Sequence, residues 1–154
     1  MILILSFLVG CLTGLRSLTP IAVICWAAKL GRLPLLDTRL SFLGSLAAAI
    51  IFSILAVAEL ISDKLPKTPS RTGVAGLSGR AIMGALSGAA VSAAARESLI
   101  LGALLGLCGG IAGAFAGYFA RTGLVRALKV PDLVIALAED LVCIAGSILL
   151  VTRY

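Results

Sequence analysis

The sequence predicts an all-α integral membrane protein, a single compact bundle of about five transmembrane helices over residues 1–154. Hydrophobic residues make up 60% of the chain and charged residues 13%, and the mean hydropathy of +1.16 is far above that of ordinary soluble domains. The apolar residues form runs of about 20, the length at which a helix crosses the ~30 Å hydrocarbon core of a bilayer. Little of the chain remains for a soluble domain once these runs are counted.

Five apolar stretches predict the helices, in the order 2–28, 40–62, 80–95, 98–120 and 133–151. The first stretch contains Arg16 and Pro20 near its centre, and Pro20 predicts a kink because proline cannot donate the backbone hydrogen bond to residue 16. The third stretch is short and rich in glycine and alanine, so four full spans plus a re-entrant third segment remain the alternative. Asp132, directly after Pro131, is expected to cap the last helix.

Lysine and arginine gather in the connections between the apolar stretches, as the positive-inside rule describes. The side that holds the second and fourth connections has seven of them and the other side five, which favours an N-terminus inside and a C-terminus outside. These basic connections account for the net charge of +6. We therefore expect a protein of the cell's inner (cytoplasmic) membrane that contacts the lipid bilayer, and no nucleic-acid partner.

The chain has no histidine, and its cysteines follow no CxxC or other ligand-like spacing. All four cysteines lie inside apolar stretches, at Cys11, Cys25, Cys108 and Cys143. The pattern supports neither a disulfide framework nor a zinc site, and no cofactor is expected.

Glycines recur every four residues in "GALLGLCGGIAGAFAG", residues 102–117. They are Gly102, Gly106, Gly109, Gly110, Gly113 and Gly117. Such small faces allow two helix backbones to approach closely in lipid, where dispersion and not the hydrophobic effect drives helix association. They predict helix packing, either inside one subunit or across a homodimer.

Ionisable groups inside the apolar stretches are functional candidates, because each costs about 2.5–3.5 kcal/mol at the bilayer centre on insertion scales. Arg16 lies about halfway along the first stretch. Glu59 and Asp63 are four residues apart and share one helix face, while Glu139 and Asp140 lie about two turns inside the last helix.

With five helices, the end of the second and the starts of the third and fifth lie on one side of the membrane. We therefore expect one polar pocket that forms a substrate or ion pathway, built from Arg16, Pro20, Glu59, Asp63, Lys64, Arg80, Glu139 and Asp140.

Three functions fit this pocket. The first is a small transporter or channel for a cation or a proton-coupled small solute, with Arg16 as counter-charge and a water-filled crevice that reaches Glu139. The second is a structural or regulatory subunit whose sealed ion-pair network fixes helix packing. The third is an enzyme that holds Mg²⁺ on the four carboxylates and a lipid phosphate on Arg16 and Arg80, although no Asp-rich metal motif supports it.

Four stretches of the chain carry a family resemblance: "GLRSLTP", "ELISDKLP", "RAIMGA" and "LAED". In this order they resemble the patterns of a family of small bacterial membrane proteins named domain of unknown function DUF4126. The resemblance implies an inner-membrane protein and no particular activity, and it covers the same residues that the charge argument selects.

Overall fold

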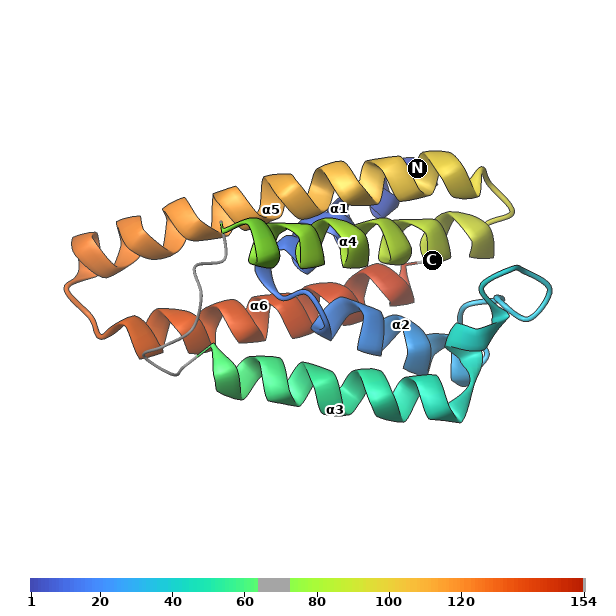
Figure 1. Cartoon of the computed structure of the whole chain (residues 1–154), viewed down its shortest axis with the longest axis horizontal. Coiled ribbons are helices and arrows are strands. Elements are labelled where there is room, and N and C mark those ends of the chain that lie inside the picture. Colours follow the sequence, from blue (N-terminus) through green and yellow to red (C-terminus); the bar gives the residue numbers. More distant parts are fainter. Residues whose placement is uncertain (64–72, 154) are drawn as a thin grey trace.

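The computed structural model describes residues 1–63 and 73–153, and within these ranges all regular secondary structure is helical, without strands (Figure 1). The order is α1 (Ile2–Leu15), α2 (Thr19–Lys29), the 3₁₀ helix η1 (Ser41–Gly44), α3 (Leu46–Ser62), α4 (Val74–Ala94), α5 (Leu99–Leu128) and α6 (Asp132–Thr152). Among the described residues, α4, α5 and α6 are long and apolar enough to cross a membrane, while α1, α2 and α3 are shorter apolar helices. The all-helical expectation is confirmed.

The first apolar stretch forms two helices and not one helix kinked at Pro20. α1 ends at Leu15, and Arg16 has an extended backbone with φ −137° and ψ 113°. Pro20 lies in the first turn of α2, where a helix has no use for a backbone N–H and the fixed φ of proline suits the start. The proline therefore begins a new helix, and the break falls on residues 16–18, before it.

The chain reverses direction at this break. Figure 1 shows α1 running from one end of the molecule to its middle and α2 running back towards the same end. Both termini consequently lie at that end, on the right of Figure 1. Five successive crossings would place them at opposite ends, so the fold does not support the expected arrangement of the termini. The segment that turns back is α1–α2 and not the third stretch, because α4 begins at Val74 and is 21 residues long.

The turn between α5 and α6 also differs from the expectation. α5 continues to Leu128 and ends where Lys129 adopts a left-handed conformation with φ 51°. α6 begins at Asp132, with Pro131 in the capping position and no side-chain cap. Asp132 does not cap the helix because its carboxylate instead accepts hydrogen bonds from Arg121.

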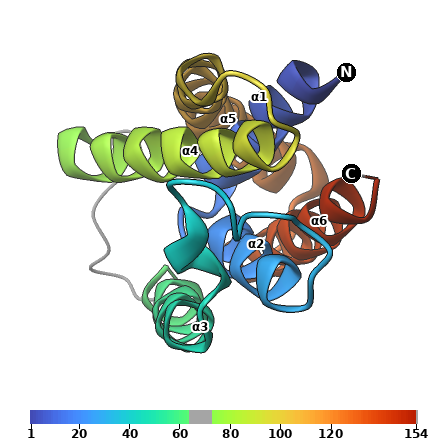
Figure 2. The same ribbon diagram turned by 90° about the vertical axis from the view of Figure 1, so that its right-hand side faces the viewer.

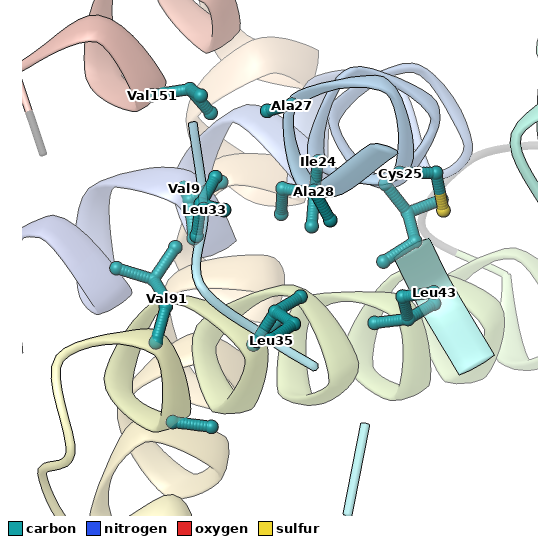
Figure 3. Packing of buried hydrophobic residues seen from close by; sticks show 14 of the residues in the cluster. Val9, Ile24, Cys25, Ala27, Ala28, Leu33, Leu35, Leu43, Val91 and Val151 are labelled. Atoms are coloured by element: carbon teal, nitrogen blue, oxygen red, sulfur yellow. The ribbon is translucent and has the colours of Figure 1, made fainter. Parts of the chain in front are cut away.

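The helices pack in two groups, which Figure 2 separates when the molecule is viewed from its right-hand end. α1 and α4 pack on α5, while α2 packs on α3 and α6. A buried hydrophobic cluster joins the two groups, and in Figure 3 Leu33 and Leu35, from the connection after α2, lie between α2 and α4. Large apolar side chains on the outer faces of α3, α5 and α6 are exposed, as expected for surfaces that meet lipid.

The glycines of α5 lie against the backbones of two neighbouring helices. A Cβ on Gly106 would overlap the carbonyl oxygen of Gly84 in α4, and a Cβ on Gly113 would overlap that of Cys11 in α1. Gly102 faces Ser92 and Gly88 of α4, and Gly110 faces the carbonyl oxygen of Arg80 in the same helix. Gly109 faces the carbonyl oxygen of Phe7 in α1. Gly117 is buried and lines a cavity described below. These close approaches are made within one chain.

Candidate functional site

The break between α1 and α2 is held by a buried arginine. The side chain of Arg16 is 0% exposed, and its Nε donates a hydrogen bond of 2.6 Å to Oδ1 of Asp140 in α6. Its Nη1 pairs with Oδ2 of Asp63, at the end of α3, and its Nη2 also lies 2.6 Å from Asp140 Oδ1. One guanidinium thus connects the break to two other helices, and its planar, forked donors suit this geometry.

Glu59 binds the other side of the break. Its Oε1 accepts hydrogen bonds from the backbone N–H of Ser17 at 2.8 Å and from the Ser17 hydroxyl at 2.5 Å, and its Oε2 accepts from the N–H of Leu18 at 2.8 Å. Backbone N–H groups at the start of a helix lack intrahelical partners and carry partial positive charge. Glu59 of α3 therefore stabilises the start of α2 from a neighbouring helix.

Arg80 of α4 fixes the end of α1. It is 5% exposed, and its Nε donates to the carbonyl oxygen of Gly14 at 3.0 Å, while its Nη1 donates to the carbonyl of Gly76 at 3.1 Å. The last carbonyls of a helix lack intrahelical partners and carry partial negative charge, which a cation satisfies. At the break, a cation (Arg80) thus holds the end of α1 and an anion (Glu59) holds the start of α2.

Glu139 and Asp140 turn to different arginines. Adjacent residues point about 100° apart on a helix, and while Asp140 meets Arg16, Oε2 of Glu139 lies 3.7 Å from Nη1 of Arg121 in α5. Arg121 also donates to both carboxylate oxygens of Asp132, at 2.7 Å and 2.5 Å. Glu139 therefore belongs to a second ion-pair group at the α5–α6 turn.

The predicted site residues are therefore only partly brought together. Arg16, Pro20, Glu59, Asp63 and Asp140 surround the break, Arg80 holds its α1 end, and Glu139 lies beside Arg121. Lys64 lies outside the described residues.

Sequence reasoning missed Arg121 and Ser17. For Arg121 a signal existed: it lies seven residues before the end of α5 and Glu139 lies seven residues after the start of α6, so an antiparallel pair with a short turn brings the two to the same level. Ser17 participates through its backbone N–H as well as its hydroxyl, which no residue pattern announces.

A cavity of about 210 Å³ lies between α5 and α6 and reaches Glu139. Its lining residues are Leu15, Gly117, Ala120, Arg121, Leu124, Ile135, Ala138, Glu139 and Val142. Only Arg121 and Glu139 among them are charged, so the walls are mostly hydrocarbon.

Across residues 1–63 and 73–153, no three or more Cys, Asp or Glu side chains are grouped so that they could hold a metal ion. Cys11, Cys25, Cys108 and Cys143 are free thiols. The four carboxylates on which a Mg²⁺ site would depend are engaged with different partners: Asp63 and Asp140 with Arg16, Glu59 with backbone N–H groups, and Glu139 with Arg121.

Comparison with known proteins finds one protein family, described as "Domain of unknown function", which matches residues 3–153. No curated protein matches the chain, and no solved structure matches it.

Proposed function

The chain belongs to the domain of unknown function family DUF4126, and from its site we propose that it is a small multi-pass transporter or channel of the inner membrane, which moves a cation or a proton-coupled small solute. The description of the family assigns no activity, so the proposal depends on the geometry of the break.

The observation that carries the proposal is the interrupted first stretch, in which α1 and α2 meet at residues 16–18 and are bound there by charged side chains from α3, α4 and α6. In transporters, interrupted helices place helix ends and free backbone groups inside the membrane domain, where they bind ions and charged substrates. Irregular backbone at membrane depth is tolerated only where it is enclosed by protein or lines a cavity.

The arrangement also supplies groups that a solute can compete for. Arg16 is shared by Asp63 and Asp140, of which Asp63 lies just after α3 and Asp140 about two turns inside α6. A cation that binds one of the two carboxylates releases that carboxylate from Arg16. An anionic group that binds Arg16 likewise displaces a carboxylate from it. Such exchange moves α3 and α6 relative to the break, which is the type of two-state element that transport requires.

The test is flux into proteoliposomes, read with pH-sensitive and cation-sensitive dyes across an imposed gradient. We compare the parent with Asp140→Asn, which removes a charge at the break, and with Glu97→Gln, which removes one from the exposed α4–α5 turn. The parent and Glu97→Gln are expected to carry flux, and folded Asp140→Asn is expected to fall to the rate of protein-free vesicles. Flux that is equal in all three, or absent from the parent with protons and with every cation tried, contradicts the proposal.

A structural or regulatory subunit is the second candidate, and the complete burial of Arg16 favours it. A buried ion pair can specify how helices pack without moving anything. In that case the parent carries no flux, and Asp140→Asn changes only the stability of the protein.

A further inference from the structure

The transport proposal rests on the break and not on the cavity between α5 and α6, which reaches Glu139 as the expected water-filled crevice would but has walls that are mostly hydrocarbon. We infer that this cavity binds one acyl chain of an anionic membrane phospholipid, whose headgroup lies at the α5–α6 turn.

The chemistry and size of the cavity suit a hydrocarbon chain. Its walls are apolar except for Arg121 and Glu139, and its volume is about 210 Å³. An apolar protein cavity of about 150 Å³ stays dry and accepts a molecule as large as benzene. This larger, partly open recess accepts a segment of a hydrocarbon chain.

The cavity lies where membrane lipid can reach it. α5 and α6 are both long and apolar enough to cross a membrane, and they are joined by a short turn. Few of their residues touch, so the recess between them is floored by Leu15 of α1 and not closed by the two helices themselves. In a bilayer the molecules that surround such a recess are lipid acyl chains.

Basic residues lie at the end of α5 that leads into the turn. Arg126 lies exposed in the last turns of α5 and Lys129 lies exposed just after it, at the end of α5 that contributes Arg121 and Leu124 to the cavity. Arg121 is engaged with Asp132 and Glu139, whereas Arg126, in the last turn of α5, and Lys129, just after it, are exposed to the surroundings. Basic groups at the end of a recess between membrane helices attract anionic headgroups. A phosphate there allows the attached chain to enter the cavity.

The experiment measures phospholipid bound to the detergent-purified full chain by native mass spectrometry, after incubation with phosphatidylglycerol or phosphatidylcholine. Ala138→Phe and Ala120→Phe fill the cavity from α6 and from α5, and both positions are exposed, so neither ring enters the packed interior. Ala116→Phe adds the same ring to an exposed position of α5 outside the cavity and serves as the control. Only variants that elute as the parent does on size exclusion are compared.

We expect the parent and Ala116→Phe to retain phosphatidylglycerol and both cavity-filling variants to lose it. Arg126→Gln combined with Lys129→Gln is expected to remove the preference for phosphatidylglycerol over phosphatidylcholine. The inference is overturned if the cavity-filling variants and the control retain equal amounts of phosphatidylglycerol. It is also overturned if the parent carries no bound lipid or is a lipid-free dimer. An unchanged headgroup preference in the double variant overturns the anionic part. None of these readouts depends on transport.

Discussion

At the scale of single residues, the arginine in the middle of an apolar stretch is explained by its partners. Arg16 is fully buried and makes an ion pair with Asp63 and another with Asp140, so its charge is neutralised inside the protein and does not face lipid. Neither carboxylate is close to Arg16 in sequence, and the three side chains meet only because the chain turns back at the break.

Replacing Asp140 by asparagine leaves Arg16 buried with one fewer opposite charge. Removing one member of a buried pair costs about 3–5 kcal/mol, because the remaining charge is left uncompensated. We expect thermal unfolding in detergent, followed by circular dichroism, to show a large decrease in melting temperature. The exposed Glu97→Gln is the control and should stay within about 0.5 kcal/mol of the parent. Similar melting temperatures for the two variants would show that the pair carries little of the stability.

At the scale of elements, α5 is shaped by where it touches its neighbours. Gly106 lies against the backbone of Gly84, whereas a Cβ on Gly123 of the same helix would meet nothing within 4 Å. The two positions have the same residue type in the same helix and differ only in their surroundings, so they form a matched pair.

Gly106→Ala should destabilise the protein by about 1–3 kcal/mol, since the added methyl group forces α4 and α5 apart. Gly123→Ala should instead stabilise it by up to about 1 kcal/mol through the higher helix propensity of alanine. Thermal unfolding of both variants measures the two signs. If both substitutions stabilise the protein, α4 and α5 do not approach as closely as the structure indicates.

At the scale of the whole molecule, the reversal at residues 16–18 sets the arrangement of the chain. α1 and α2 return to the end at which they begin, and α3 to α6 then run alternately between the two ends, so both termini lie together (Figure 1). Charge counts over the connections assumed five crossings and therefore placed the termini apart.

Epitope tags at the two termini should be cleaved together by protease in vesicles of one orientation and be protected together in the opposite orientation. A tag inserted after Asp37, in the connection between α2 and η1, should share this behaviour because that connection lies at the same end. If one tag is cleaved and the other is protected from protease in vesicles of a single orientation, the five-crossing arrangement is correct instead.

Much of this protein follows from composition and local pattern. Hydropathy located the apolar segments, because burial in hydrocarbon needs long runs of apolar side chains. It merged α1 and α2 into one stretch, and it missed the starts of α3 and α4 and the end of α5 by six to eight residues. Their charge alone marks Arg16, Glu59, Asp63 and Asp140 as site candidates, since an ionisable group in an apolar stretch is costly unless it has a partner. The family resemblance, found on the same residues, is confirmed.

The tertiary structure alone decided how these parts meet. Pro20 is compatible with a kink or with a new helix, and the choice depended on Glu59 and Arg80, which satisfy the backbone groups that a break exposes. The partner of Glu139 was likewise decided by packing, because the antiparallel α5–α6 pair brings Arg121 to it. Local sequence determines which segments are helical and which groups need partners; contacts between segments far apart in the chain determine where a helix stops and which partner is found.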